Sequence, residues 1–271
     1  EKTSGMEETC IDFPLPNSSA EPLRFRSPGG SFRPTAASRV CVQAILDNFG
    51  LLHGVGLDWG CGCGILAVAA AKIPTVERVV GLDIALENVQ AAETNALLNG
   101  VQDSSSFIHA DSYQPFTSPD AAKLEAMFGG VDFILANPPA SDGDGFDFRR
   151  AVIRGAEPFM KDGGRLFLQI SYQYSEARIL GLVKDCPSFS YEGVIASTDW
   201  VPFDQQREDL RQQVKDYAAE EARGGIKYCF RHPQADGTMN AEEALRHFED
   251  TGESPLSKWQ THLYVFHSRR E

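Results

Sequence analysis

The 271-residue sequence predicts an α/β protein built on a doubly wound, mostly parallel sheet of seven strands, with helices on both faces. Two observations carry this prediction. Short apolar runs of strand length alternate along the chain with longer segments of helical period, and repeated strand-then-helix units form parallel sheets. Several of these apolar runs end in aspartate, asparagine or glycine, and an open α/β sheet binds its ligands at the carboxyl ends of its strands.

The order of these segments along the chain gives the expected elements. Strands are predicted at residues 55–59, 78–84, 106–110, 131–136, 165–171, 189–197 and 261–267. Helices are predicted at residues 35–48, 65–72, 85–99, 119–128, 147–160 and 174–184. The helix at 85–99 is typical, because Leu86, Val89 and Leu97 recur at helical spacing and Gly100 is a suitable C-cap.

A glycine-rich turn follows the first predicted strand, with glycines at positions 60, 62 and 64. Glycine lets the backbone turn tightly and lets a ligand lie against it. A dinucleotide fingerprint would need its third glycine at position 65, which is Ile65. Asp58, two residues before the first glycine, would repel a pyrophosphate and attract an ammonium group. The turn therefore suits S-adenosylmethionine, which carries an α-ammonium and a sulfonium.

Polar residues also end the next strands. Asp83 lies about twenty residues after the glycine turn, a spacing at which a carboxylate accepts both ribose hydroxyls, and Ile84 can cover one face of an adenine. Asp111 and Ser112 follow the third strand and can accept from the adenine amine. Each aspartate could instead be a helix N-cap. Because parallel strands end at one edge, we expect these residues and Asn137 to meet in one crevice.

The fourth strand ends in Asn137-Pro138-Pro139. The side-chain oxygen of Asn137 and the carbonyl of Pro138 can both accept hydrogen bonds from a planar amine or amide. Proline restricts its own backbone and that of the preceding residue, so these acceptors are held in place. Taken alone, the tripeptide is equally compatible with an ordinary strand-to-loop turn.

Taken together, these motifs make the chain similar to the Rossmann-like S-adenosylmethionine-dependent methyltransferases that carry an N-P-P motif. It resembles the release-factor glutamine methyltransferases and the small-domain methyltransferase group, over roughly residues 34–195, with further similarity at 143–150 and 163–170. The resemblance implies an antiparallel last strand. The sequence departs from that family at Ala140, where an aromatic residue is usual. It also shows no counterpart of the N-terminal helical domain of the bacterial members, so the substrate does not carry over.

This resemblance and the residue chemistry assign roles within the site. Asn137 and Pro138 are the predicted catalytic residues, which hold the acceptor nitrogen. The residues assigned to the cofactor S-adenosylmethionine are Asp58, Gly60, Cys61, Gly62, Asp83, Ile84, Asp111, Ser112 and Asn137.

Substrate contacts are expected from Pro139, Ala140, Phe146 and Phe148. Without an aromatic side chain at position 140, either Phe146 or Phe148 supplies a stacking face, or the acceptor is not a flat base. Further aromatic candidates are Phe25, Phe32 and Trp200, and packing in the core is the alternative for all of these rings.

The chain divides into three parts. Residues 1–33 are an N-terminal arm or lid with a basic-aromatic segment, residues 34–203 and 258–271 form the methyltransferase core, and residues 204–257 form a helical insertion between strands six and seven. A helix is expected at 204–223, capped by Asp204, and a second one behind the capping box of Asn240 and Glu243. The insertion is either a substrate lid, a buttress or an oligomer surface.

Composition restricts the partners. A net charge of −13 weighs against a nucleic-acid substrate, since long nucleic acids are bound through basic surface. The six cysteines and six histidines show no metal-ligand spacing, so no metal is expected. The sequence contains no signal peptide and no apolar run of membrane length, so we expect a cytoplasmic protein without a membrane partner.

The sequence thus predicts an S-adenosylmethionine-dependent methyltransferase that N-methylates a protein side chain or a small molecule. Three alternatives remain: a non-catalytic cofactor-binding subunit that supports another methyltransferase, a nucleobase N-methyltransferase, and a dinucleotide oxidoreductase. Intact Asp83 and Asn137 oppose the first alternative, and the acidic charge opposes the second. The identity of the acceptor and the oligomeric state are left open.

Overall fold

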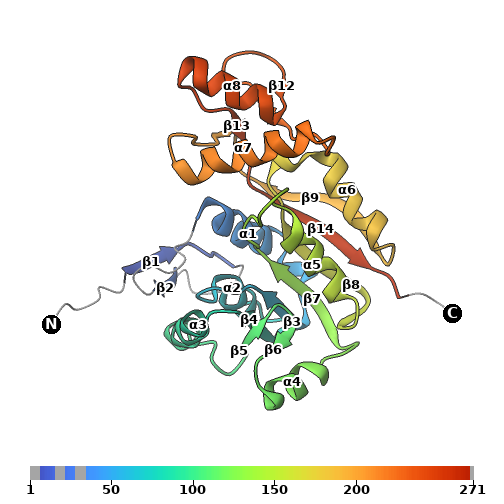
Figure 1. Cartoon of the computed structure of the whole chain (residues 1–271). Coiled ribbons are helices and arrows are strands. Elements are labelled where there is room, and N and C mark those ends of the chain that lie inside the picture. The colour runs from blue at the N-terminus through green and yellow to red at the C-terminus, as the bar shows by residue number, and fades with distance from the viewer. Residues whose placement is uncertain (1–6, 16–21, 28–34, 269–271) are drawn as a thin grey trace.

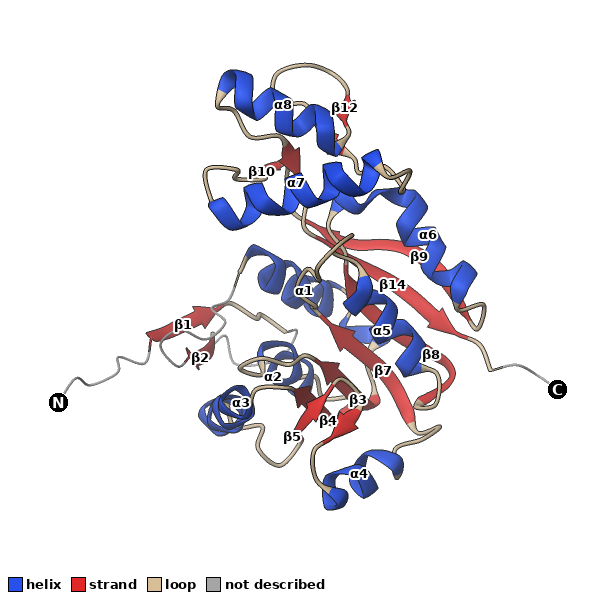
Figure 2. Ribbon diagram, viewed as in Figure 1, coloured by secondary structure: helices blue, strands red, loops and turns tan. Residues whose placement is uncertain are grey.

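The central feature of the protein is one large sheet in a computed structural model that describes residues 7–15, 22–27 and 35–268. Eight strands lie in the order β6-β5-β4-β3-β7-β8-β14-β9, with helices on both faces (Figures 1 and 2). In chain order these strands are β3 (Gly54–Trp59), β4 (Val76–Asp83), β5 (Ser105–Asp111), β6 (Gln114–Pro115), β7 (Val131–Ala136), β8 (Met160–Gln169), β9 (Phe189–Ser197) and β14 (Gln260–Phe266).

The helices follow the strands as expected. They are α1 (Ala36–Asp47), α2 (Ile65–Ala71), α3 (Leu86–Leu98), α4 (Ser118–Glu125), α5 (Asp147–Ala156), α6 (Ser175–Asp185), α7 (Glu208–Ala222) and α8 (Ala241–Thr251), with short 3-10 helices η1 (Phe49–Leu51) and η2 (Tyr172–Tyr174).

Pairing within the sheet confirms a mostly parallel arrangement with an antiparallel last strand. Strands β5, β4, β3, β7 and β8 pair in parallel, and β14 runs antiparallel to both β8 and β9. The predicted number of seven strands is corrected to eight. Ser112 adopts a left-handed backbone with φ 56° and reverses the chain, so that Gln114 pairs with Asp111. No glycine marks this turn in the sequence.

Alternate side chains of the central strand β7 point to opposite faces of the sheet. This strand therefore lies at the centre of the core. Phe133 and Leu135 belong to the cluster formed with α1, α2 and α3. Ile134 and Ala136 belong to the cluster formed with α4, α5 and α6. Because both faces are covered, all six residues of β7 are buried.

Three boundaries differ from the predictions. Strand β8 begins at Met160, not at residue 165. The expected turn at 162–164 is instead an irregularity within β8, which pairs with β7 on both sides of it: Met160 with Val131, and Arg165 with Phe133. Helix α5 therefore ends at Ala156. Helix α7 begins after Arg207, and Asp204 instead accepts from the main-chain N–H of Gln206 in the preceding turn. The capping box of Asn240 and Glu243 is confirmed.

The described N-terminal residues form a hairpin of β1 (Glu7–Ile11) and β2 (Leu23–Ser27) that packs against α3. Arg24 and Arg26 both pair with Glu8, at 2.7 and 3.1 Å, so their guanidinium groups already have an anionic partner. Phe25 is fully buried in the core. Phe32 and Arg33, the other half of the predicted basic-aromatic segment, lie outside the described residues.

The segment between β9 and β14 contains strands as well as the predicted helices. Helices α7 and α8 pack against each other and accompany a small sheet in the order β10-β13-β11-β12. Its strands are β10 (Val201–Pro202), β11 (Phe230–Arg231), β12 (Thr238–Met239) and β13 (Leu256–Ser257). Side chains from this segment join the same apolar cluster as β7 and β8, including Tyr217, Phe230 and Ala244. The segment is thus continuous with the core.

Candidate active site

A cavity of about 420 Å³ lies at the carboxyl edge of the parallel strands. Asp58, Asp83, Asp111 and Asn137 all line this cavity, so the four polar strand ends meet as expected. The complete lining consists of Ser38, Asp58, Trp59, Gly60, Cys61, Gly62, Cys63, Ile65, Leu66, Leu82, Asp83, Ile84, Asn88, Ala110, Asp111, Ser112, Asn137, Pro139, Phe148 and Ala151. Every residue that the sequence assigns to the cofactor is among them.

The glycine turn is hydrogen-bonded to the end of the neighbouring strand β4. Gly60, Gly62 and Gly64 have φ values of 63°, 53° and 83°, which are left-handed conformations that favour glycine. The main-chain N–H of Gly62 donates to Asp83 at 2.7 Å, and that of Cys61 donates to the Leu82 carbonyl at 2.9 Å. These bonds give the floor of the cavity a defined shape.

Asp58 is a buried carboxyl with one unsatisfied oxygen. Its Oδ2 accepts from the main-chain N–H of Ala67 at 2.9 Å, whereas its Oδ1 has no hydrogen-bond partner in the described part of the chain. Burial raises the pKa of Asp58 to about 8. A buried oxygen without a donor, in a residue that lines the cavity, fits the ammonium group of the cofactor.

Asp83 is oriented by three donors from its own neighbourhood. Its Oδ2 accepts from Gly62, and its Oδ1 accepts from the main-chain N–H of Ala85 at 2.9 Å and from Asn88 Nδ2 at 3.0 Å. The N-cap residue of α3 is Ala85, so Asp83 does not serve as the helix cap. Ile84 next to it is 62% exposed and lines the cavity, which suits a flat apolar ligand face.

Asp111 and Ser112 close the adenine side of the expected site. Asp111 is exposed at the cavity rim, and Ser112 Oγ accepts from Trp59 Nε1 at 2.8 Å. Trp59 was not among the predicted site residues, although it directly follows Asp58 at the end of β3. The hydrogen bond shows that the tryptophan ring and the third strand end form one wall.

Asn137 is half-buried and donates from Nδ2 to Ser38 Oγ at 3.4 Å. Ser38 also forms the capping box of α1 with Thr35. Sequence reasoning missed Ser38, because its only local signal is that of a helix start. This bond orients the amide so that Oδ1 remains as the acceptor.

Three predicted substrate or catalytic residues lie elsewhere. Pro138 is buried outside the cavity lining, and its carbonyl accepts from Arg149 Nη2 at 3.2 Å, so this oxygen bonds within the protein and does not face the cavity. Phe146 is 1% exposed and packs against Tyr174, out of reach of an acceptor. Ala140 is half-buried and also outside the lining.

The other predicted substrate residues do line the cavity. Pro139 is exposed, and Phe148 is 39% exposed with its ring centroid 6.1 Å from that of Trp59. Phe148 is therefore the ring that faces the cavity. Trp200 lies outside the lining, with its ring 4.8 Å from that of Tyr172.

The described residues contain neither a metal-binding cluster nor a membrane-spanning helix. Histidine, cysteine and carboxylate side chains in these parts of the chain form no group of three that could hold a metal ion. No helix within residues 7–15, 22–27 and 35–268 is long and apolar enough to cross a membrane.

Comparisons with known proteins identify the family of this chain. A family model described as "Methyltransferase small domain" matches residues 31–186. The ribosomal protein L11 methyltransferase of Salmonella arizonae is 37% identical over 110 residues, 41% of this chain and 33% of the relative. That of Alteromonas mediterranea is 39% identical over 109 residues, 40% and 32% of the two chains. This chain thus spans about a third of the length of the curated relatives it matches.

A solved structure shares the fold. The T. thermophilus 16S rRNA N2 methyltransferase RsmC, in complex with AdoMet and guanosine, superposes with a TM-score of 0.52 at 22% identity, over 69% of this chain and 47% of that chain. The family model covers more than half of the 271 residues. The chain therefore belongs to the methyltransferase small domain family, and it is a methyltransferase domain whose cofactor is S-adenosylmethionine.

Proposed function

We propose that this protein N-methylates a protein side chain, with a small molecule as the second kind of acceptor. The observation that carries the proposal is the meeting of Asp58, Asp83, Asp111 and Asn137 around one cavity. Three carboxylates suit the cationic and hydroxyl-bearing parts of the cofactor, and the amide of Asn137 suits a nitrogen that still carries hydrogen. The relatives named as ribosomal protein L11 methyltransferases support a protein acceptor.

The proposed cofactor contacts follow from the geometry of the site. The unsatisfied Oδ1 of Asp58 accepts from the α-ammonium group, and Asp83 accepts from the ribose hydroxyls. Ile84 covers the adenine, and Asp111 accepts from its amine. When bound, S-adenosylmethionine supplies an activated methyl group on its sulfonium.

Asn137 is the residue that we assign to the acceptor. Its Nδ2 is engaged by Ser38, so Oδ1 accepts an N–H of the substrate and directs the nitrogen lone pair into the cavity. Because the methyl group is already activated, the protein contributes mainly orientation and exclusion of water. The cavity lining is suited to this, since most of it is apolar side chain or main chain.

Methylation of a nucleobase is the second candidate function. The exposed ring of Phe148, beside Trp59 on the cavity wall, could stack on a flat base. The solved structure of RsmC contains guanosine. The net charge of −13 weighs against a large RNA, because phosphate contacts need basic surface.

One labelling experiment separates these functions. The protein is incubated with methyl-labelled S-adenosylmethionine and a fractionated lysate, and the label is then followed into protease-sensitive, nuclease-sensitive and small-molecule material. Label in protein supports the main proposal, and label in nucleic acid supports the second. Asn137→Ala is the matched control and should transfer none. Cofactor binding without any transfer would instead indicate a non-catalytic subunit.

The cytoplasm is the proposed site of action. All six cysteines are free thiols, and Cys41, Cys61, Cys63 and Cys186 are buried. This usage is typical of proteins in a reducing compartment.

A further inference from the structure

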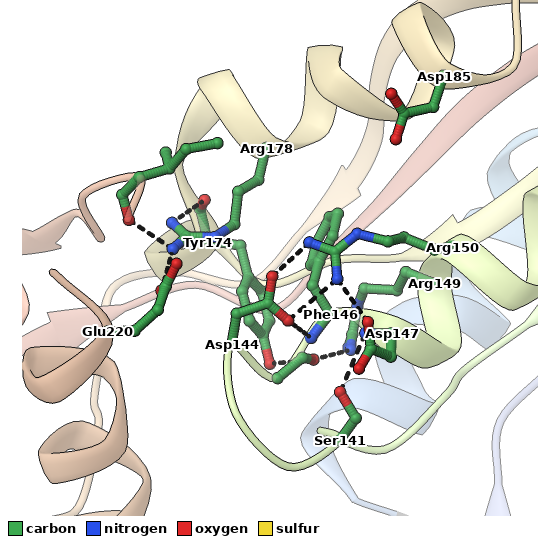
Figure 3. Close-up of polar contacts among 12 residues, drawn as sticks. Ser141, Asp144, Phe146, Asp147, Arg149, Arg150, Tyr174, Arg178, Asp185 and Glu220 are labelled. Atoms are coloured by element: carbon green, nitrogen blue, oxygen red, sulfur yellow. Dashed lines mark hydrogen bonds and ion pairs between the residues drawn. The ribbon is translucent and has the colours of Figure 1, made fainter. Parts of the chain in front are cut away.

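The loop that carries the N-P-P motif is held by side chains from both the methyltransferase core and the inserted segment. We define the acceptor loop as residues 137–146, from Asn137 to the start of α5. Figure 3 shows Tyr174 and Arg149 beside Asp144 and Phe146 of this loop, and Arg178 paired with Glu220 of α7. Side chains from α5, η2, α6 and α7 thus meet on the side of the loop that faces the protein interior.

Arg149 uses all its donors to hold main-chain and amide oxygens. Nη2 donates to Pro138 at 3.2 Å and to Gln169 Oε1 at 3.0 Å, and Nη1 donates to Pro139 and Gly145, both at 3.1 Å. Nε donates to the Gln169 carbonyl at 3.1 Å. The side chain is buried, and its guanidinium carbon lies 4.8 Å from the centre of the Tyr174 ring. The guanidinium therefore ties both ends of the acceptor loop to the end of β8.

Gly145 is linked to the inserted segment through Tyr174. The Tyr174 hydroxyl donates to the Gly145 carbonyl at 3.0 Å and lies 3.1 Å from the Tyr217 hydroxyl. Gly145 has a φ of 71°, and a Cβ there would lie 2.8 Å from the Tyr174 hydroxyl and 3.0 Å from that of Tyr217. Burial holds the pKa of Tyr217 well above its ordinary value, so its hydroxyl keeps its proton.

A second contact runs through Tyr228. Its hydroxyl lies 2.9 Å from the Asp144 carbonyl and 2.7 Å from Glu220, so it bridges the loop and α7. Glu220 also accepts from Arg178 of α6 at 2.5 Å, and Arg178 donates to the carbonyls of Ile226 and Lys227. The Arg178 guanidinium lies 3.8 Å from the centre of the Tyr228 ring. This network joins the inserted segment to the core at several points.

We propose that residues 204–257 are a fixed support for the acceptor loop, and that Arg149 and Tyr217 are positioning residues for methyl transfer. The proposal rests on the proposed function, because it needs Asn137 to hold the acceptor. A lid would have to release its contacts at each turnover. Here the contacts are made by Tyr217 and Tyr228, which are 1% and 3% exposed, and opening would expose their rings and hydroxyls to water.

Two glycines of the acceptor loop provide a matched test. Gly143 and Gly145 have φ values of 70° and 71°, so an alanine has the same backbone strain at either position. A Cβ at Gly143 meets nothing within 4 Å, whereas one at Gly145 meets the two tyrosine hydroxyls. Gly145→Ala should displace the loop from its support, and Gly143→Ala should not.

The expected results are specific to acceptor positioning. Because small misplacements of reacting groups slow a reaction strongly, Gly145→Ala should reduce kcat at least about tenfold relative to Gly143→Ala. The KM for S-adenosylmethionine and its calorimetric Kd should change less than about twofold, since Asp58, Asp83 and Asp111 lie on other loops. Equal kcat values for the two variants would overturn the proposal.

Gentler variants keep the test valid if Gly145→Ala folds poorly. Tyr217→Phe removes one hydroxyl from the support, and its control Tyr191→Phe removes a hydroxyl that bonds His262 of β14 instead of Tyr174. Arg149→Lys keeps the charge and loses the planar fork, and its control is Arg154→Lys on the exposed side of the same helix. Only Tyr217→Phe and Arg149→Lys should lower kcat.

Hydrogen exchange separates failure of this proposal from failure of the proposed function. Tyr217→Phe should speed amide exchange in residues 141–146, and Tyr191→Phe should not, whatever the acceptor is. If the wild-type protein transfers no label, the proposed function fails while the exchange result still tests the support. Unchanged exchange in Tyr217→Phe would refute the support even in an active enzyme.

Discussion

At the scale of single residues, Asp58 determines how the site responds to pH. Its pKa of about 8 arises from burial and is opposed by the hydrogen bond from Ala67. The cofactor-free protein therefore carries a neutral Asp58 at pH 7, whereas binding an ammonium group favours the carboxylate. Binding should release a proton below pH 8.

We expect the affinity for S-adenosylmethionine to fall as the pH is lowered from 7.5 to 6, by up to about tenfold per pH unit. Calorimetry across this range measures the change. Asp58→Asn should bind more weakly, with an affinity that barely depends on pH, and it also corrects for ionisation of the cofactor itself. A wild-type affinity that is constant over this range would contradict the assignment.

The same raised pKa has a consequence for stability. The folded protein keeps a proton on Asp58 between about pH 4 and pH 8, while the unfolded chain has lost it. The contribution of Asp58 therefore makes the free energy of unfolding fall as the pH rises through this window, with a limiting slope of about 1.4 kcal/mol per pH unit. Asp58→Asn should lack this contribution in urea titrations of the cofactor-free protein.

Asn137 and Asp83 should have separable roles. Asn137→Ala removes the acceptor contact and should abolish methyl transfer while leaving cofactor affinity largely intact. Asp83→Ala removes the partner of Gly62, Ala85 and Asn88 and should weaken cofactor binding at least about tenfold. Calorimetry and labelled methyl transfer on both variants check this, and normal turnover in both would show that the site lies elsewhere.

At the scale of elements, the N-terminal hairpin is connected to the glycine turn through the side chain of Asn95. Asn95 of α3 is fully buried, accepts from the Arg26 N–H at 2.8 Å, and donates to the carbonyls of Arg26 at 3.0 Å and Cys63 at 2.9 Å. The amide thus pairs with β2 as a neighbouring strand would, and it reaches the glycine turn as well.

Asn95→Ala should destabilise the protein by about 2–3 kcal/mol, since the three hydrogen bonds of a fully buried amide are lost at roughly 1 kcal/mol each. Asn99→Ala is its control at the C-cap of the same helix, where the bonds to Arg24 are exposed and one further bond goes to the Asn95 carbonyl, and it should cost less than about 1 kcal/mol. Urea denaturation measures both. Equal losses of unfolding free energy in the two variants would mean that the hydrogen bonds of Asn95 to β2 stabilise the protein no more than the exposed bonds of Asn99.

At the scale of the whole molecule, the inserted segment and the core share one apolar cluster. Tyr217, Phe230 and Ala244 of the insertion belong with Ile134 and Leu166 of the central sheet. A segment that shares a core should unfold with it. This continuity is also why we treat the insertion as a support and not as a separate module.

We therefore expect thermal unfolding to be one cooperative transition, with the helices α7 and α8 protected from hydrogen exchange to the same degree as β7 and β8. Scanning calorimetry and peptide-resolved exchange check this on the intact chain. An early transition confined to residues 204–257 would contradict the shared core.

Much of the site could be predicted from the sequence because its signals are local. Asp58, Asp83, Asp111 and Asn137 each follow an apolar run, and parallel strands bring such ends to one edge. Ser38 and Trp59 were missed, since their places in the cavity depend on how α1 packs and on a bond to the third strand end. Phe148 and Phe146 could not be told apart without knowing which face of α5 is buried.

The sequence by itself determined the order of strands and helices along the chain, the glycine turn and the polar strand ends that line the cavity, because backbone preference and strand polarity act over a few neighbouring residues. Only the tertiary structure decided that Arg149 donates to the carbonyl of Pro138 and that Tyr217 lies beside Gly145, linked to it through the Tyr174 hydroxyl. Those contacts join segments 11 and 72 positions apart (149 − 138 and 217 − 145). No local sequence pattern predicts these contacts, since they depend on which donors and acceptors are brought together in the folded core.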